Sequence, residues 1–367
     1  MTTKTPTEPG QERLKQFLLA AAIPITAVLL AALIGAILLI LSGADPIAAY
    51  SALIKGSFGS ERAFGRTLEK ATPLILGGLA VAFAFKGGLF NIGGQGQLLF
   101  GAIIAGALGF GISGLPFVIH MPLALLGGAL AGALYATISG ALKAFTGAHE
   151  VITTIMLNFI AINITDFLAN GVWKDTSGIV ARTPAILETA AIPRLGTNMP
   201  LGFFIAAFIA FLVWYLLFRT TLGFEIRTVG LNNHAAHYAG ITVARITILT
   251  MGISGFLAGM GGAIETLGVV GRFQPGFNVG LGFDGITIAL LARTNPLAVI
   301  PAAILIGAMQ GGASQMQFDA KVSFEIIDVI QALILFFVSA EMIVRYILRI
   351  RADQGGSVTL STGWGQG

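Results

Sequence analysis

Three amide side chains interrupt a strongly apolar stretch in the first third of the chain. Asn91, Gln95 and Gln97 lie among several glycines in FKGGLFNIGGQGQLLFGA, residues 85–102. A carboxamide both donates and accepts hydrogen bonds, so it suits either a neutral polar solute or irregular backbone. Because glycine tolerates dihedral angles that other residues avoid, residues 91–97 are predicted to form a break between two helices, with the amides lining or bracing a route through the protein.

Further polar side chains lie in segments that are otherwise apolar. Polar groups within a membrane usually face a bundle interior or a watery cavity. The alternative is hydrogen bonding between helices, worth about 0.6 kcal/mol for each group. Together with the three amides they favour a polar pathway, and because most are uncharged they suit a neutral solute better than an ion. The residues are Asn158, Asn163, Asp166, Glu265, Asp284, Gln310 and Gln315.

The composition places these segments in a lipid bilayer. The chain has 367 residues, of which 55% are hydrophobic and 10% charged, and its mean hydropathy is +0.87. Soluble domains carry about 25% charged residues, so this chain cannot cover a water-soluble surface and is expected to contact membrane lipid. The 21 basic residues against 17 acidic ones are too scattered to bind nucleic acid. The absence of cysteine excludes disulfide and thiol chemistry.

The elements that position these residues are membrane-spanning helices. A bilayer core about 30 Å thick needs roughly 20 apolar residues for each helix. Lipid-embedded backbone must be hydrogen-bonded within its own segment, so we expect an all-α polytopic bundle of about 9–10 transmembrane helices, some of them discontinuous. A shorter segment at 281–292 is predicted to be broken or re-entrant. The predicted spans are 17–41, 70–86, 88–110, 116–142, 151–170, 201–218, 246–268, 296–314 and 324–346.

The predicted organisation is a single membrane domain at 17–346 between two polar tails, 1–16 and 347–367. Ten crossings place both termini on one side, and the basic residues of the two tails place that side in the cytoplasm. The loop at 171–200 is then external, and the loop at 219–245 is cytoplasmic.

Two other regions have features of their own. The loop at 42–69 is predicted to be long and external. Segments 76–105 and 255–289 share one outline, a glycine-rich helix, a polar break and a second helix of small residues. That outline suggests an internal inverted repeat.

The cytoplasmic loop predicts a short helix within RTTLGFEIRTVGLNNHAAHYAGI. Asn232 or the asparagine after it can cap the helix, and Gly240 can end it. An apolar face follows from the spacing i, i+4, i+7 and i+8. A helix of this kind either rests on the membrane surface or docks a cytoplasmic partner. The face consists of Leu231, Ala235, Tyr238 and Ala239.

Several motifs that would carry chemistry are absent or lack their context. The GxGxxG matches at 109–114 and 280–285 follow no predicted strand, so they do not predict a dinucleotide site. No GxxxxGK[ST] sequence occurs, so the chain has no P-loop of its own. His234 and His237 have no carboxylate nearby in sequence, so no metal site is predicted. Without a catalytic motif we expect no catalytic residues, and a membrane enzyme is disfavoured.

Four segments together resemble the permease subunits of bacterial ABC importers for nucleosides and simple sugars. The resemblance is greatest to the nucleoside-type branch and runs from about residue 79 to residue 296. Each segment alone is moderately specific, and the set is highly specific. The segments are GLAVAFAFKGGLFNIGGQGQLLFGA, HEVITTIMLNFIA, RTTLGFEIRTVGLNNHAAHYAGI and LGFDGITIALLARTNP.

The resemblance implies partners and a location. It implies a heterodimeric membrane core with a second permease subunit, a cytoplasmic ABC ATPase and an external substrate-binding protein, all at the bacterial inner membrane. ATP and Mg would be bound by the ATPase, so this chain would need no cofactor. The loop at 219–245 would hold a coupling helix in the ATPase cleft. The residues expected there are Gly230, Asn232, Ala235, Ala236, Tyr238 and Gly240.

The resemblance implies import of a nucleoside, with a simple sugar as the alternative. A stand-alone secondary transporter, coupled through carboxylates such as Asp166, Glu265 and Asp284, is less favoured. Two positions depart from the family pattern. The family often has Glu where Gln95 stands, so an argument that needs a carboxylate there fails for this chain. It also has Asn where His149 stands, which leaves the following glutamate in place.

Overall fold

Helices form most of the described chain. The structure is a computed structural model that describes residues 9–177, 180–196, 198–276, 280–323 and 325–340. The expected tail at 347–367 lies outside these residues. The elements, in chain order, are α1 Pro9–Leu41, α2 Pro46–Phe58, α3 Glu61–Lys86, α4 Gly94–Gly111, α5 Phe117–Thr146, α6 Glu150–Asn170, a 3₁₀ turn Glu188–Ala190, β1 Arg194–Leu195, β2 Met199–Pro200, α7 Leu201–Arg219, α8 Thr221–Leu231, α9 Asn233–Tyr238, α10 Val243–Glu265, a π-helical turn Thr266–Val270, α11 Leu281–Leu291, α12 Val299–Ala320 and α13 Glu325–Ser339.

Eight of the described helices are long and apolar enough to cross a membrane, namely α1, α3, α4, α5, α6, α7, α10 with its π turn, and α12. The all-α membrane fold is therefore confirmed. The predicted segment at 281–292 is the short apolar helix α11. The last predicted span, 324–346, contains α13, and its residues 324 and 341–346 lie outside the described residues.

The predicted loop at 42–69 is wrong in its secondary structure. It contains α2 and the first nine residues of α3. Ser60 caps α3 by accepting a hydrogen bond from the backbone N–H of Ala63 at 3.1 Å, and Glu61 lies in the first turn, where a negative charge is favourable. The charged residues of these turns lower the hydropathy, so the segment was not predicted to span the membrane, but charged residues are compatible with a helix.

The described chain falls into two compact units, one of residues up to Ser51 and from Met316 onward, the other of residues 52–315. In the first unit α1 packs against α13, and the Tyr50 hydroxyl donates to the backbone oxygen of Ala32 at 2.6 Å. The second unit contains every candidate site residue. The single membrane domain stays a prediction.

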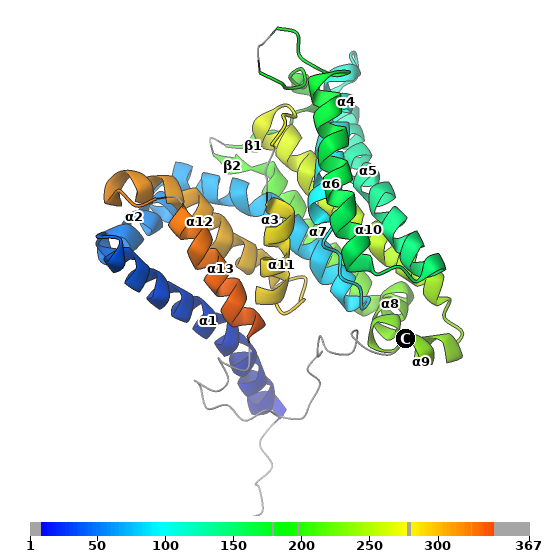
Figure 1. Ribbon diagram of the computed structural model, residues 1–367, viewed down its shortest axis with the longest axis horizontal. Coiled ribbons are helices and arrows are strands. Elements are labelled where there is room, and N and C mark those ends of the chain that lie inside the picture. The colour runs from blue at the N-terminus through cyan, green and yellow to red at the C-terminus, as the bar shows by residue number, and fades with distance from the viewer. Residues whose placement is uncertain (1–8, 178–179, 197, 277–279, 324, 341–367) are drawn as a thin grey trace, which may run out of the picture. The chain divides into compact units, whose positions relative to one another are not determined.

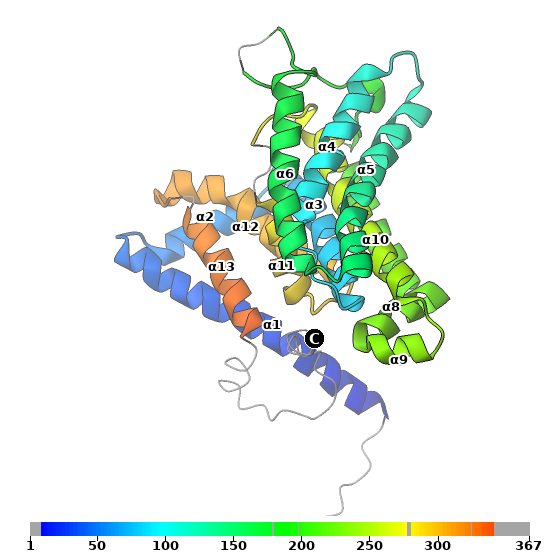
Figure 2. The same cartoon turned by 45° about the vertical axis from the view of Figure 1, so that its right-hand side comes forward.

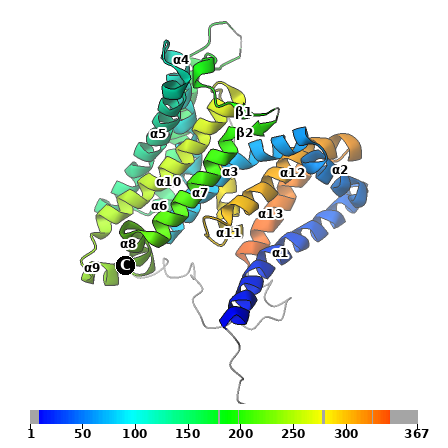
Figure 3. The same ribbon diagram turned by 180° about the vertical axis from the view of Figure 1, so that it is seen from behind.

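In the second unit α10 packs against α3, α4 and α5, and α4 also packs against α5 and α6 (Figures 1 and 2). Seen from behind, α7 runs along the same group of helices (Figure 3). Helices approach this closely where glycines face one another. A Cβ atom added at Gly101 of α4 would lie 2.1 Å from the backbone oxygen of Gly259 in α10, and one at Gly132 of α5 would lie 2.5 Å from the backbone oxygen of Gly255. The backbones of three helices are therefore in direct contact.

We expect Gly101→Ala to destabilise the protein. The new methyl group would meet backbone atoms of α10, which cannot move aside as a side chain can, and overpacking of this kind costs about 1–3 kcal/mol or more. Gly106→Ala is the matched control in the same helix, because its methyl group would find only the Thr266 side chain at 3.5 Å. The control should be neutral or more stable by up to about 1 kcal/mol, since alanine favours helix. Thermal unfolding in detergent measures both, and equal midpoints would contradict the close contact.

Candidate translocation and coupling sites

The predicted break lies between α3, which ends at Lys86, and α4, which begins at Gly94. Gln95 and Gln97 are therefore in the first turn of α4, so the break, at residues 87–93, lies earlier in the chain than the predicted 91–97. Asn91 is the only one of the three amides in the irregular segment. Its side chain is 1% exposed.

Asn91 uses all of its hydrogen-bonding positions. Its Nδ2 donates to Gln97 Oε1 at 2.8 Å and to Ser254 Oγ at 2.7 Å. Its Oδ1 accepts from Gln97 Nε2 at 2.9 Å and from the backbone N–H of Gly93 at 3.0 Å. The Ser254 hydroxyl in turn donates to the backbone oxygen of Ala80 in α3 at 2.7 Å. A carboxamide offers two donor hydrogens and two acceptor lone pairs, so Asn91 has none left for a solute.

Asn158 attaches α6 to the same segment. It accepts a hydrogen bond from the backbone N–H of Gly96 at 2.8 Å and donates to the backbone oxygen of Ile92 at 2.9 Å. The first N–H groups of a helix have no partner within the helix. Asn158 therefore supplies an acceptor to the first turn of α4, and it is itself 3% exposed.

Gln95 connects the beginnings of two helices. Its Oε1 accepts a hydrogen bond from the backbone N–H of Gly282, in the first turn of α11, at 2.9 Å. The Gln95 side chain is buried. In α11 the next polar residue is Asp284, whose Oδ2 accepts from Gln310 Nε2 of α12 at 3.0 Å. Asp284 and Gln310 are both partly exposed.

The other predicted pathway residues lie apart from this network. Asn163 is exposed on α6, and its Nδ2 donates to the backbone oxygen of Phe159 in the same helix at 2.7 Å. Asp166 is partly exposed one turn further on. Glu265 is buried at the end of α10, where the π turn begins, and Gln315 is partly exposed in α12. The structure brings Asn91, Gln95, Gln97 and Asn158 together.

Two features of the site were not predicted from the sequence. Ser254 joins the amide network from α10, and its only sequence signal is a single serine in a glycine-rich helix. Lys143, near the end of α5, forms an ion pair with Glu150 at the start of α6, with Nζ and Oε2 3.0 Å apart. Glu150 is 9% exposed. The pair fixes the turn between the two helices at the end where α9 also lies.

The predicted short helix is α9, and its ends are those expected. Asn232 Oδ1 accepts from the backbone N–H of Ala235 at 3.0 Å, and Gly240 ends the helix region with φ +81°. Leu231 belongs to α8 and not to α9, because the extended backbone of Asn232 ends one helix and begins the next. Gly230 also lies in α8.

The face predicted around α9 is exposed in this chain. Tyr238 is 90% and Leu231 79% exposed, and Ala235 and Ala239 are exposed as well. Ala236, by contrast, is fully buried. Large apolar side chains outside a membrane are rarely left so exposed together. The face is therefore a candidate docking surface.

The segment at 171–200 lies at the opposite end of the second unit from α9 (Figure 1). Its backbone follows the end of α10, with Thr183 N–H donating to Phe273 O and Ile192 N–H to Leu267 O, both at 2.9 Å. Hydrogen bonds from the Ser177 hydroxyl and backbone N–H hold the pKa of Asp175 below its usual range, with a further contribution from Arg182. The described residues of this segment are therefore held to the chain that follows α10 by backbone hydrogen bonds.

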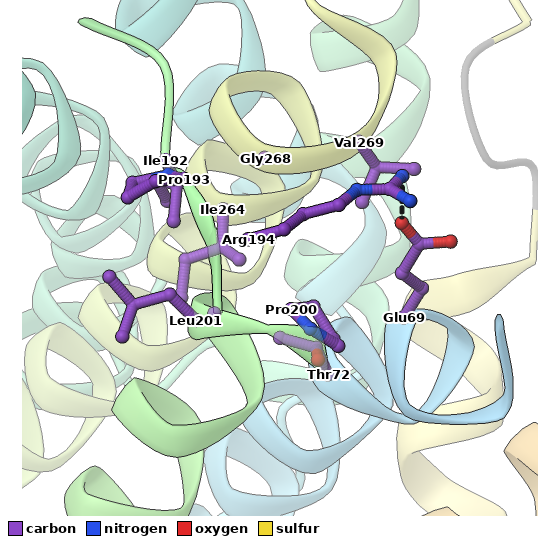
Figure 4. Close-up of a pocket in the computed structure, with 11 residues that line it drawn as sticks. Glu69, Thr72, Ile192, Pro193, Arg194, Pro200, Leu201, Ile264, Gly268 and Val269 are labelled. Atoms are coloured by element: carbon purple, nitrogen blue, oxygen red, sulfur yellow. Dashed lines mark hydrogen bonds and ion pairs between the residues drawn. The ribbon is translucent and has the colours of Figure 1, made fainter. Parts of the chain in front are cut away.

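A small pocket lies beneath the β1–β2 hairpin (Figure 4). Arg194 of the hairpin reaches across it to form an ion pair with Glu69 of α3. The cavity volume is about 10 Å³, which holds about one water molecule. It cannot hold an organic solute in this conformation. Among the described residues, no group of three or more His, Asp or Glu could hold a metal ion.

We expect Asn158→Leu to destabilise the protein, because the Gly96 N–H and the Ile92 carbonyl would lose their partners. Each buried group left unpaired costs about 1–3 kcal/mol. Asn163→Leu is the matched control in the same helix, and at an exposed position it should change stability by less than about 0.5 kcal/mol. Thermal unfolding in detergent compares them. An Asn158→Leu protein as stable as the control would remove the bracing role of this amide.

The family model described as "Branched-chain amino acid transport system / permease component" matches residues 64–339. The match covers most of the chain and includes the break, α9 and α11. The chain belongs to this permease family.

Curated relatives match nearly the whole chain. The guanosine ABC transporter permease protein NupP of Bacillus subtilis is 40% identical, with 89% of this chain and 95% of the relative covered. The nucleoside ABC transporter permease protein NupB of Lactococcus lactis is 35% identical, covering 93% and 97%. The glucose ABC transporter permease protein TsgB13 of Haloferax volcanii is 33% identical, covering 92% of each. The same Bacillus subtilis strain has a second guanosine permease relative, NupQ, 29% identical over 66% of this chain and 79% of its own length.

Proposed function

We propose that the chain is a permease subunit of an ATP-driven importer and forms half of the translocation pathway for a neutral solute, a nucleoside. The observation that carries the coupling part of this proposal is the exposed face of α9, a short capped helix outside the membrane helices. The nucleoside is supported by relatives named as guanosine and nucleoside permeases, at 40% and 35% identity.

The amides divide into two roles in this proposal. Asn91, Gln95, Gln97 and Asn158 are buried and bonded to neighbouring helices, so they hold the break in shape. Contact with the solute falls to the polar residues that keep some exposure. These are Asn163, Asp166, Asp284, Gln310 and Gln315. Glu265, at the π turn, stays a candidate because π turns often occur at functional sites.

The partners in the proposal are a second permease subunit, a cytoplasmic ABC ATPase and an external substrate-binding protein. Two permease relatives in one Bacillus subtilis strain, both named for guanosine, support a heterodimeric membrane core. ATP and Mg would bind to the ATPase, and this chain would not itself act as an enzyme. The complex would lie in the bacterial inner membrane with both termini of this chain in the cytoplasm.

A simple sugar is the second candidate solute, because a glucose permease is 33% identical to this chain. Nucleosides and simple sugars both contain a sugar ring whose hydroxyl groups form hydrogen bonds. A nucleoside adds a flat base, which apolar walls can contact. A nucleoside importer and a sugar importer can therefore be distinguished by which unlabelled solute competes for uptake.

We expect proteoliposomes with both permeases, the ATPase and the binding protein to take up labelled guanosine only when ATP is inside. Excess unlabelled nucleoside should abolish the uptake, whereas excess glucose should not. Competition by glucose alone would favour the sugar importer. Uptake without ATP, or uptake of a charged amino acid instead, would contradict the proposal.

We expect Ala235→Glu to abolish solute-stimulated ATP hydrolysis and uptake. The substitution would place a carboxylate on the exposed face of α9, and burying an ion against a partner costs several kcal/mol. The protein should still fold, because Ala235 is exposed and the new carboxylate can stay in water.

Two controls separate docking from the effect of an added charge. Ala235→Ser should be mild, because a hydroxyl is small and uncharged. Ala148→Glu adds the same charge in the neighbouring turn between α5 and α6 and should leave transport unchanged. Co-purification of the ATPase and uptake are measured together. An Ala235→Glu complex that assembles and transports at the normal rate would exclude α9 from coupling.

A further inference from the structure

The segment between α3 and α4 is in direct backbone contact with α8. A Cβ atom added at Gly230 of α8 would lie 2.3 Å from the backbone oxygen of Lys86 and 2.8 Å from the carbonyl carbon of Gly87. A Cβ atom added at Gly88 would lie 2.9 Å from the Cα of Gly230. No side chain separates the two backbones. A displacement of α8 would therefore press directly on the backbone at the start of the break, because no flexible side chain lies between them.

α8 is itself held firmly at this end. Ile226 is fully buried, and its Cγ2 lies 3.4 Å from the position that a Cβ of Gly87 would occupy. Val229 is also buried. The exposed helix α9 follows α8 directly, because Asn232 ends the one and caps the other. Any force on α9 therefore passes into α8 over a single residue.

The break and the residue just after it are also hydrogen-bonded to three other helices. Asn91 bonds to Ser254 of α10, the Ile92 carbonyl bonds to Asn158 of α6, and Gln95, just beyond the break, bonds to Gly282 of α11. These bonds join residues up to 187 positions apart in sequence. The break thus contacts α8 and is also hydrogen-bonded to α6 and α10.

We propose that the Gly230–Gly88 contact transmits the movement of α9 to the break, and through its amides to α6, α10 and α11. Gly230 and Gly88 are then positioning residues. Because they have no side chains, the two backbones can stay in direct contact. This rests on the proposed function, in which an ATPase moves α9. The competing explanation is that the glycines serve only the stability of the packed unit.

The test uses two substitutions that separate the backbones from opposite sides, each with a matched control. Gly230→Ala inserts a methyl group against Lys86 and Gly87, and its control is Gly111→Ala, where nothing lies within 4 Å. Gly88→Ala inserts one against Gly230 at a backbone φ of +71°, and its control is Gly147→Ala, which has φ +70° and nothing within 4 Å. Both controls replace glycine by alanine without touching a neighbouring backbone. The second control also reproduces the strain of an alanine at positive φ.

The readout follows both ends of the proposed connection in the complete complex. Because the chain has no cysteine, single cysteines can report maleimide labelling with and without vanadate-trapped nucleotide. His234→Cys reports on α9, where the side chain is exposed, and Phe283→Cys reports on α11, where the side chain is 48% exposed. Uptake and stimulated ATP hydrolysis are measured on the same complexes without the cysteines.

We expect trapping to change labelling at both sites in the otherwise unchanged complex and in the two controls. With Gly230→Ala or Gly88→Ala, the change at His234→Cys should persist while that at Phe283→Cys is lost. Uptake should fall at least about fivefold, the lower end of the usual range for coupling between sites.

Two results would overturn the inference. One is a normal change at Phe283→Cys with normal uptake in both substituted complexes. The other is loss of assembled complex in both, with controls intact, which would assign the contact to stability alone. If trapping leaves His234→Cys unchanged in the unsubstituted complex, the coupling role of α9 itself fails, which is a separate outcome.

Discussion

Backbone groups that are kept from water must be hydrogen-bonded, and a helix that stops inside a membrane protein leaves several of them without helical partners. Between α3 and α4 this requirement is met by side-chain amides. Asn91 bonds to the N–H of Gly93, and Asn158 to the N–H of Gly96 and the carbonyl of Ile92. These amides belong to other helices or bond to them. The hydrogen bonds that pair the backbone of the break therefore also fix where α6, α10 and α11 lie.

Features that depend on neighbours in sequence could be predicted from the sequence. The membrane-spanning helices follow from runs of apolar residues, and the ends of α9 follow from the capping preferences of Asn232 and Gly240. The break itself follows from glycines beside polar residues. Its limits were predicted less well, because Gln95 and Gln97 are as compatible with the first turn of a helix as with a loop, and hydrogen bonds to distant residues decide between the two.

The role of each polar residue could not be predicted in the same way. Asn158 and Asn163 are the same residue type in one helix, yet one is buried between helices and the other exposed. Five positions apart, they project from different faces at about 100° for each residue, but the sequence does not say which face meets α4. Ser254 was missed for the same reason, since its partners come from a segment more than 160 residues earlier.

The glycine contacts among α4, α5 and α10 have a consequence for how a solute can cross. At these contacts the backbone oxygens of one helix lie where the side chains of the next would be, so the helices are packed backbone against backbone. We therefore expect the three helices to move together as one rigid body. In the proposed importer, a permeating molecule would then travel along the outer wall of this group.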